Sequence, residues 1–288
     1  MTQKNAASLT QERIAALVKN AIAEDLGDAG DLTSLSVIPE NATAKVDIVA
    51  RDNGICAGID FADIAFRELA PNNRLTRLVD DGDALSHGTK LMHIEGNARS
   101  ILSAERVALN FMGHMSGIAS ETAKLVAAVS GTKAQICDTR KTTPGLRAIE
   151  KYAVRIGGGI NHRFGLYDAI LIKDNHIGVA GSIEKALEQA FSYAGHMVQV
   201  EIEVDTLVQL EQALNAGARV ILLDNMTPDQ LREAVALTNG RAKLEASGRV
   251  SLETVKAIAE TGVDYISVGR ITHSAACLDL GLDITIKS

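Results

Sequence analysis

Cysteine is scarce in this sequence, and the three cysteines exclude two classes of small protein. Cys56, Cys137 and Cys277 are odd in number and far apart along the chain. They fit neither a disulfide framework nor a zinc site built from close ligand pairs. We therefore expect reduced thiols that pack as small apolar residues.

Long apolar runs are also absent. Residues 1–20 have no continuous apolar core of the signal-peptide type, and no later stretch approaches the length of a membrane span. We expect a cytoplasmic protein that does not bind a membrane. The formal net charge of -7 argues against a nucleic-acid partner that is bound through bulk charge.

The composition is that of a chain that folds throughout. Apolar residues make up 46% of the 288 positions and charged residues 23%, with no low-complexity tract. This length allows two modest domains or one barrel. The acidic average hides a local reversal, because residues 140–173 are rich in Arg, Lys and His. A cationic patch in an acidic protein indicates a site for small anions.

The first part of the chain mixes helical and strand patterns. Apolar residues recur at helical spacing over 14–22, after Ser8 or Thr10 as the capping residue. Strands are expected at residues 44–50, 54–58, 74–79 and 90–96, and helices at 61–70, 100–112 and 118–129. We expect a small α+β sandwich domain over residues 1–112, completed by residues 275–288.

From residue 134 onward, strand and helix patterns alternate. The expected strands are residues 134–138, 169–173, 198–204, 219–224, 242–247 and 264–269. Amphipathic helices are expected at about 145–154, 182–194, 206–215, 228–238 and 251–260. This spacing implies parallel strands that are joined by crossover helices.

Polar side chains recur where these strands end, which is where barrel enzymes place their chemistry. Asp138, Glu203, Asp224 and Glu245 are examples. Because only six strand–helix repeats are present, we expect an incomplete, about six-stranded parallel α/β barrel over residues 113–274. An open doubly wound sheet is the second choice.

The segment DTRKTTPGLR, residues 138–147, has the composition of an anion site. Arg140 offers a planar fork to a carboxylate or phosphate, and Lys141 offers a mobile point charge. Thr139 and the start of the next helix add hydrogen-bond donors. A solvated basic loop is the plain alternative for an isolated Arg-Lys pair.

The segment GGGINHRFGLYDAILIKDNH, residues 157–176, adds further cations. Its three glycines give backbone freedom beside a ligand or a tight bend, and His162 and Arg163 follow at once. Lys173 ends an apolar strand, where a charge is costly to bury without an anion. A structural histidine at 162 and a solvent-directed lysine at 173 remain open, but the clustering of cations favours a binding site.

Carboxylates follow on the next two strands. Glu203 and Asp224 lie near successive carboxyl ends, where hard oxygen ligands hold Mg²⁺ beside phosphates. They are also suited to hydrogen-bonding ribose hydroxyls, and both roles fit one sugar pyrophosphate. Ordinary strand-end acidity is the plain alternative.

Small residues end the last two strands. Ser247-Gly248 and Gly269-Arg270 each lie between a strand and a helix. Small side chains there expose backbone N–H groups to a phosphate, as the late loops of phosphate-binding barrels do.

Together these motifs resemble the quinolinate phosphoribosyltransferase family, also called carboxylating nicotinate-nucleotide pyrophosphorylase. The matching segments are EDLGDAGDLTS, GDALSHG, SAERVALNFMGHMSGIAS, DTRKTTPGLR, GGGINHRFGLYDAILIKDNH, EIEVDTL, LLDNM, LEASGRV and GVDYISVGRITHS. The match spans nearly the whole chain. It implies a sandwich domain, a short barrel, and a homodimer whose active sites are shared between subunits.

The resemblance also implies roles for single residues. The quinolinate pocket would be lined by Arg140, His162, Arg163 and Lys173, with Arg106 reaching in from the partner subunit. Phosphoribosyl pyrophosphate and its Mg²⁺ would be surrounded by Lys141, Glu203, Asp224, Ser247, Gly248 and Gly269, with His273 near the phosphate loop. Glu203 and Asp224 would hold the metal, and Lys141 and Lys173 would share the catalytic role with them. Arg270 stands where the family often has a small residue.

The implied reaction joins quinolinate to phosphoribosyl pyrophosphate and releases CO₂ and pyrophosphate, as in de novo NAD biosynthesis. A paralogue of the same fold with another substrate is the nearest alternative. A non-catalytic barrel that senses sugar phosphates and a metal-dependent aldolase with a Schiff base at Lys173 are more distant ones. The acidic pair beside the phosphate loops argues against the sensor.

Overall fold

The computed structural model describes residues 9–285 and divides the chain into two compact units. The first unit extends to Glu121 and also contains Ala148–Gly157 and the segment from Ser274 onward. The second unit comprises Thr122–Arg147 and Gly158–His273. The helix α4, Ala98–Ala128, runs through residue 112 without a break. The domain boundary expected at residue 112 stays a prediction.

An antiparallel sheet forms the base of the first unit. Its strand order is β12-β1-β5-β3, with β1 at Thr43–Ala50, β3 at Arg74–Arg77, β5 at Lys90–Asn97 and β12 at Leu280–Thr285. The C-terminal strand β12 pairs with β1, which places Leu282 opposite Ile48. Short strands β2, Gly54–Ile55, and β4, Ala84–Leu85, form a separate pair.

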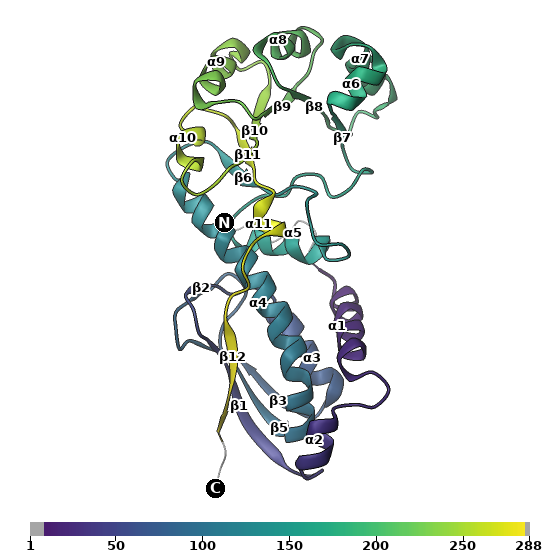
Figure 1. Ribbon diagram of the computed structural model, residues 1–288, viewed down its shortest axis with the longest axis vertical. Coiled ribbons are helices and arrows are strands. Elements are labelled where there is room, and N and C mark those ends of the chain that lie inside the picture. The colour runs from purple at the N-terminus through teal and green to yellow at the C-terminus, as the bar shows by residue number, and fades with distance from the viewer. Residues whose placement is uncertain (1–8, 286–288) are drawn as a thin grey trace. The chain divides into compact units, whose positions relative to one another are not determined.

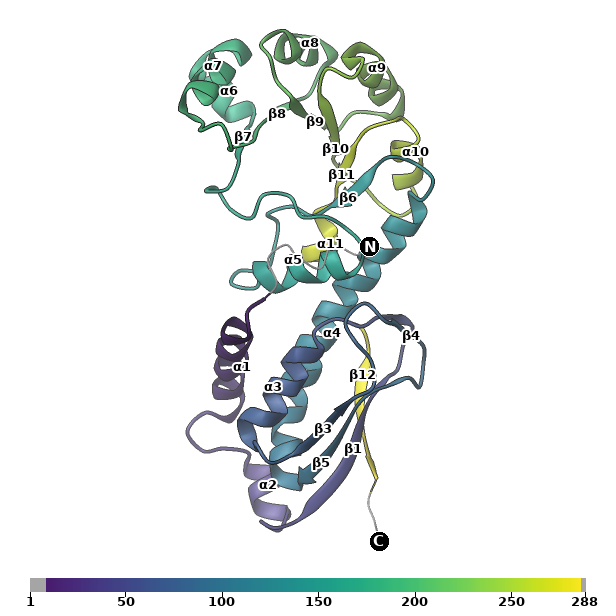
Figure 2. The same cartoon turned by 180° about the vertical axis from the view of Figure 1, so that it is seen from behind.

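The helices of this unit are α1 at Gln11–Leu26, α2 at Leu32–Val37, α3 at Ile59–Leu69, the first part of α4, and most of α5, Arg147–Ile156. Of these, α3 and the first part of α4 lie beside the sheet, and α1 packs on α3 (Figures 1 and 2). Thr10 caps α1 by accepting a hydrogen bond from the Arg13 N–H at 3.3 Å. The alternative cap, Ser8, lies outside the described residues.

The two helices expected at 100–112 and 118–129 are one continuous helix, α4, so the break expected at Ser116-Gly117 is wrong. Gly117 serves close packing instead: a Cβ atom there would lie 2.0 Å from the Ala276 carbonyl oxygen. At Gly113 the Leu278 N–H donates to the backbone carbonyl at 2.9 Å. Glycine therefore lets the C-terminal segment lie against the helix on its way to β12.

The second unit is an incomplete parallel α/β barrel, as the sequence predicts. Its six strands have the order β6-β11-β10-β9-β8-β7, and each neighbouring pair is parallel. The strands are β6 Gln135–Cys137, β7 Ile170–Ile172, β8 Val200–Val204, β9 Val220–Asp224, β10 Lys243–Ser247 and β11 Tyr265–Ser267. No pairing between β6 and β7 closes the ring within residues 9–285.

The outside of this sheet is covered by α6 Asp174–Ala180, α7 Ile183–Tyr193, α8 Leu207–Asn215, α9 Pro228–Thr238 and α10 Val255–Ala259 (Figures 1 and 2). The short helix α11, Arg270–His273, follows β11 and does not belong to this outer layer. The sequence pattern did not predict α6. This helix has seven residues and no buried side chain, so it lacks the repeating apolar face by which helices are recognised in a sequence. The helix expected at 251–260 is regular only over α10, because Ser251 begins a turn whose N–H donates to Thr254 Oγ1.

The cysteines are free, and their burial differs. Cys56 and Cys137 are buried as expected, but Cys277 is exposed. A Cβ atom at Gly117 would lie 3.1 Å from the Cys277 Cα atom, so the backbone of this segment approaches α4 closely. Among the described residues, no helix is long and apolar enough to cross a membrane.

Candidate active site

A cavity of about 650 Å³ lies at the carboxyl ends of the barrel strands. This volume suits a small organic ligand. The residues predicted from sequence that line it are Thr139, Arg140, Lys141, His162, Arg163, Lys173, Glu203, Asp224, Ser247, Gly248, Gly269, Arg270 and His273. Parallel strands end at one edge of a sheet, and this edge brings together side chains that are up to 134 positions apart, from 139 to 273.

Arg106 lies elsewhere. It is an exposed residue of α4 in the first unit and does not belong to the cavity lining of the second unit. A contribution of Arg106 from a partner subunit therefore stays a prediction.

Arg140 and Arg163 are two of the cations that line the cavity. The Arg163 side chain donates from Nη1 to the Ala169 carbonyl at 3.0 Å, but the buried Nε atoms of both arginines have no hydrogen-bond partner among the described residues. Burial, followed by the nearby charge of Arg140, lowers the pKa of Arg163. Unpaired buried donors of this kind are costly unless an anion meets them.

Arg147 links the two cationic loops. Its Nε donates to Thr142 Oγ1 at 3.0 Å, and its Nη1 donates to the Phe164 carbonyl at 3.0 Å. Asp138 also holds the second of these loops, because its buried carboxylate accepts a hydrogen bond from the His162 backbone N–H at 2.9 Å. These contacts fix the loops that present Arg140 and Arg163.

The acidic part of the cavity comes from adjacent strands β8 and β9. The Glu203 carboxylate forms an ion pair with Lys173, and Asp224 Oδ2 accepts from Asn225 Nδ2 at 2.6 Å. The structure thus pairs Lys173 with Glu203, two groups that the sequence assigned to different ligands.

The loop after β10 meets the loop after β9 without space for a side chain. A Cβ atom at Gly248 would lie 2.2 Å from Asn225 Oδ1, and Gly248 has a φ of 108°. Asn225 itself is left-handed, with a φ of 53°. Glycine is required at 248 both by its conformation and by the neighbouring amide.

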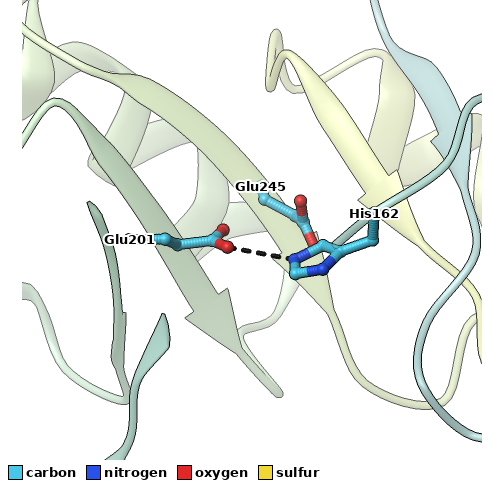
Figure 3. Close-up of side chains that lie close together, drawn as sticks. All are labelled: His162, Glu201 and Glu245. Atoms are coloured by element: carbon cyan, nitrogen blue, oxygen red, sulfur yellow. Dashed lines mark hydrogen bonds and ion pairs between the residues drawn. The ribbon is translucent and has the colours of Figure 1, made fainter. Parts of the chain in front are cut away.

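Two residues that the sequence interpretation did not assign to the site lie below these loops. Glu201 on β8 and Glu245 on β10 are buried, and both carboxylates point toward His162 (Figure 3). His162 Nε2 lies 3.0 Å from Glu201 Oε2 and 3.7 Å from Glu245 Oε1. Burial, followed by the charge of Glu201, raises the pKa of Glu245 to about 7.

A sequence signal for these glutamates exists. Side chains alternate between the two faces of a strand, so Glu201 shares a face with Glu203, and Glu245 shares one with Ser247. A glutamate two positions before a strand-end residue of the site therefore points into the barrel as well. Charged residues are rare in such interiors unless they are paired.

Comparison with known proteins agrees with the geometry. The family model described as "Quinolinate phosphoribosyl transferase, C-terminal domain" matches residues 118–283, and the corresponding N-terminal domain matches residues 31–116. The chain belongs to the quinolinate phosphoribosyl transferase family.

Individual members of the quinolinate phosphoribosyl transferase family are similar along nearly their whole length. A probable carboxylating nicotinate-nucleotide pyrophosphorylase of Bacillus subtilis is 47% identical over 272 residues, covering 94% of this chain and 93% of that protein. A carboxylating nicotinate-nucleotide pyrophosphorylase of Mycobacterium leprae is 45% identical, covering 93% and 95%. The crystal structure of NadC from Streptococcus pyogenes superimposes with a TM-score of 0.92 at 41% identity, covering 98% and 100%. The family resemblance that the sequence motifs indicate is confirmed.

Proposed function

We propose that the chain transfers the phosphoribosyl group of phosphoribosyl pyrophosphate to quinolinate and decarboxylates the product to nicotinate mononucleotide. CO₂ and pyrophosphate are the other products. Family membership supports this reaction. The observation that carries it is the pair Arg140 and Arg163, whose buried Nε atoms lack partners among the described residues and which line the same cavity as Lys173.

Quinolinate complements this cationic cluster. It carries two adjacent carboxylates, and a guanidinium fork binds a carboxylate through two parallel hydrogen bonds. Burial, followed by the charge of Arg140, disfavours the cationic form of Arg163, as its lowered pKa indicates. An arriving dianion removes that cost, so part of its binding free energy is the relief of repulsion.

Lys173 and Glu203 form an ion pair. A substrate carboxylate offers Lys173 a second acceptor. Glu203 is then available to order the ribose or a metal beside it. Binding of quinolinate at Lys173 thus frees Glu203 to contact the second substrate, phosphoribosyl pyrophosphate.

The first step is displacement of pyrophosphate from the ribose by the pyridine nitrogen. As the bond to pyrophosphate breaks, positive charge develops on the sugar and negative charge on the leaving group. Lys141 is an exposed residue of the cavity lining and is suited to stabilise the leaving group. Its backbone is fixed, because the Lys141 carbonyl accepts from Thr272 Oγ1 at 2.7 Å.

Glu203 and Asp224 have the chemistry of a Mg²⁺ site. Both offer carboxylate oxygens from neighbouring strands, and Mg²⁺ in phosphate-binding sites is commonly held by one or two carboxylates together with the substrate phosphates. This donor set fits the ion. Bound Mg²⁺ would neutralise charge on the pyrophosphate.

The second step is loss of the 2-carboxylate. Once the ring nitrogen carries the ribose it is cationic, and it stabilises the electron pair that stays on C2 when CO₂ departs; that pair then takes up a proton. The step therefore asks little of the protein beyond holding the ring.

A homodimer with shared active sites, with Arg106 contributed by the partner subunit, is part of the proposal. A cytoplasmic location and the absence of nucleic-acid partners stay predictions. The acidic net charge of -7 supports the latter.

A panel of pyridine acids tests the substrate. Purified protein, phosphoribosyl pyrophosphate and Mg²⁺ are combined with quinolinate, nicotinate or pyridine-2-carboxylate, and pyrophosphate release is followed. We expect quinolinate to be used at least about 100-fold better than either monocarboxylate, because each loses one charge-assisted pair. Equal use of the three acids would identify a paralogue with another substrate. Tight binding without release would favour a sensor.

A further inference from the structure

The Arg147 side chain forms hydrogen bonds to both cationic loops. It is the last residue of the motif DTRKTTPGLR and the first residue of α5. Its Nε donates to Thr142 Oγ1 and its Nη1 to the Phe164 carbonyl, both at 3.0 Å, and its Nη2 donates to the Arg140 carbonyl at 3.4 Å. Two of these acceptors lie in the loop before α5 and the third lies in the loop after it, so one guanidinium connects the two loops.

Two roles suit an arginine in this motif. It can bind a substrate carboxylate directly, as is expected of Arg140, or it can bind only the protein. Arg147 is partly buried and is not among the residues that line the cavity, whereas Arg140 and Lys141 are. Each of its three guanidinium nitrogens already donates to an oxygen of the chain. These observations favour a role inside the protein.

We propose that Arg147 is a positioning residue that sets the spacing of Arg140 and Arg163 for the two carboxylates of quinolinate. The inference deepens the proposed function and rests on it for the identity of the substrate. The guanidinium is planar and rigid, so a single group bonded to both loops prevents one loop from shifting without the other. A cation that is displaced by about 1 Å loses much of its effect on a bound substrate.

The Arg140 carbonyl is the point at which the contacts of the first loop meet. It accepts from Arg147 Nη2, from the Thr142 N–H at 3.0 Å and from Thr142 Oγ1 at 3.5 Å. Thr142, like Arg147, does not line the cavity, so both residues act on Arg140 through its backbone. The side chain of Arg140 is thereby left to the cavity, where its buried Nε lacks a partner among the described residues.

The second loop is held at the peptide groups that follow Arg163. The Phe164 carbonyl accepts from Arg147, and the Phe164 N–H donates to the Asp168 carboxylate at 2.6 Å. Asp168 also accepts from the Gly165 N–H at 2.8 Å. The backbone next to Arg163 is therefore fixed from two directions, and one of them depends on Arg147.

Lys141 has a support of its own. The hydroxyl of the buried Thr272 donates to the Lys141 carbonyl at 2.7 Å and also lies 3.0 Å from the Gly269 carbonyl. One loop thus carries cations for two ligands and is held at two points, by Arg147 at residues 140 and 142 and by Thr272 at residue 141. Loss of Arg147 should therefore impair the use of quinolinate more than that of phosphoribosyl pyrophosphate.

Steady-state kinetics with each substrate varied in turn test this separation. Arg147→Lys keeps the charge but loses the planar fork that spans both loops. It should lower kcat/KM for quinolinate by on the order of tenfold to 100-fold and leave the KM for phosphoribosyl pyrophosphate at the wild-type value. Thr272→Val should leave the quinolinate KM unchanged and impair the use of phosphoribosyl pyrophosphate. Arg232→Lys, in an exposed ion pair on α9, is the matched control and should match the wild type.

A second variant distinguishes positioning from direct contact with the substrate. Thr142→Val removes the acceptor of Arg147 Nε and changes no charge, and it remains informative if Arg147→Lys does not fold. It should lower kcat/KM for quinolinate by a smaller factor. The double variant should be no worse than Arg147→Lys, because both substitutions remove the same support. Losses that multiply in the double variant would mean that Arg147 contacts the substrate, and would overturn the proposal.

Hydrogen exchange followed by mass spectrometry tests the loops without reference to activity. In Arg147→Lys the backbone amides of residues 139–146 and 158–168 should both exchange faster than in the wild type. In Thr272→Val only the first of these loops should do so. Unchanged exchange in both loops of Arg147→Lys, or a wild-type kcat/KM for quinolinate, would overturn the proposal. A wild-type protein that does not use quinolinate, with the expected exchange in its variants, would instead contradict the proposed function alone.

Discussion

At the scale of single residues, the cavity combines two arginines whose buried Nε donors lack a partner among the described residues with carboxylates that are already bonded. Arg140 and Arg163 keep buried donors unpaired among the described residues, whereas Glu203 and Asp224 are already bonded to Lys173 and Asn225. The protein therefore bears an energetic cost at the arginines that an anionic ligand relieves. The unpaired arginine donors thus account both for the affinity for an anionic ligand and for the charge complementarity between that ligand and the cavity.

Arg163→Ala tests whether the arginine donors provide the affinity for the anionic substrate. The substitution removes a guanidinium that would form charge-assisted hydrogen bonds worth about 1.5–3 kcal/mol each, so two of them correspond to a fall in kcat/KM of about 10²–10⁴-fold. Steady-state kinetics with quinolinate measure it. Arg232→Ala is the control, because that side chain forms an exposed pair with Asp229 on α9. A near-normal rate in Arg163→Ala would remove the residue from the site.

Glu245 makes the free energy of unfolding depend on pH. Burial raises its pKa from an ordinary value of 4.5 to about 7, so between these pH values the folded protein keeps a proton that the unfolded chain releases. Stability contributed by the neutral acid is complete below pH 4.5 and is lost as the pH rises toward 7.

Glu245→Gln imitates the neutral acid at every pH. Relative to the wild type it should gain up to about 3 kcal/mol in unfolding free energy between pH 5 and pH 8. Urea unfolding of both proteins at the two pH values gives the difference. If the two proteins respond to pH identically, the carboxyl does not carry the proton.

At the scale of elements, close backbone contact decides where glycine is needed. In α4, Gly117 faces the carbonyl of Ala276, whereas the sequence interpretation divided this helix between residues 112 and 118. The contact is made by a segment about 160 positions later in the chain, so no local pattern around Gly117 indicates it. Tertiary packing outweighs the local preference.

Gly117→Ala should destabilise the protein by at least about 1–3 kcal/mol, because the new Cβ would lie 2.0 Å from the Ala276 oxygen. Gly178→Ala in α6 is the matched control, since a Cβ there has no heavy atom within 4 Å. That variant should gain about 0.5–1 kcal/mol from helix propensity. Thermal or urea unfolding measures both, and equal effects at the two glycines would contradict the packing explanation.

At the scale of the whole molecule, sequence periodicity was sufficient for the architecture. Alternating strand and helix patterns gave the incomplete barrel because parallel strands and crossover helices repeat with a regular spacing. Strand ends such as Lys173 and Asp224 were placed together because parallel strands share an edge. Glu201 was not assigned although it shares a strand face with Glu203. Arg147 was not assigned because its role depends on contacts with Thr142 and Phe164 that no local pattern encodes.

Subunit sharing is the remaining question at this scale, and mixed dimers test it. Arg106→Ala and Lys173→Ala should each be inactive alone. When they are mixed and allowed to exchange subunits, about a quarter of the wild-type activity should return, because half of randomly paired dimers are mixed and each has one intact site. No recovery, with mixed dimers demonstrated, would contradict a site completed by Arg106 of the partner subunit.

The central claim is that cations from separate strand ends hold a dianionic pyridine acid beside a sugar diphosphate so that transfer and decarboxylation follow. Its most direct test is simultaneous measurement of CO₂, pyrophosphate and nicotinate mononucleotide with quinolinate, phosphoribosyl pyrophosphate and Mg²⁺. The account predicts equal amounts of the three products at every time point. Pyrophosphate without CO₂, or binding of both substrates with no product, would contradict it.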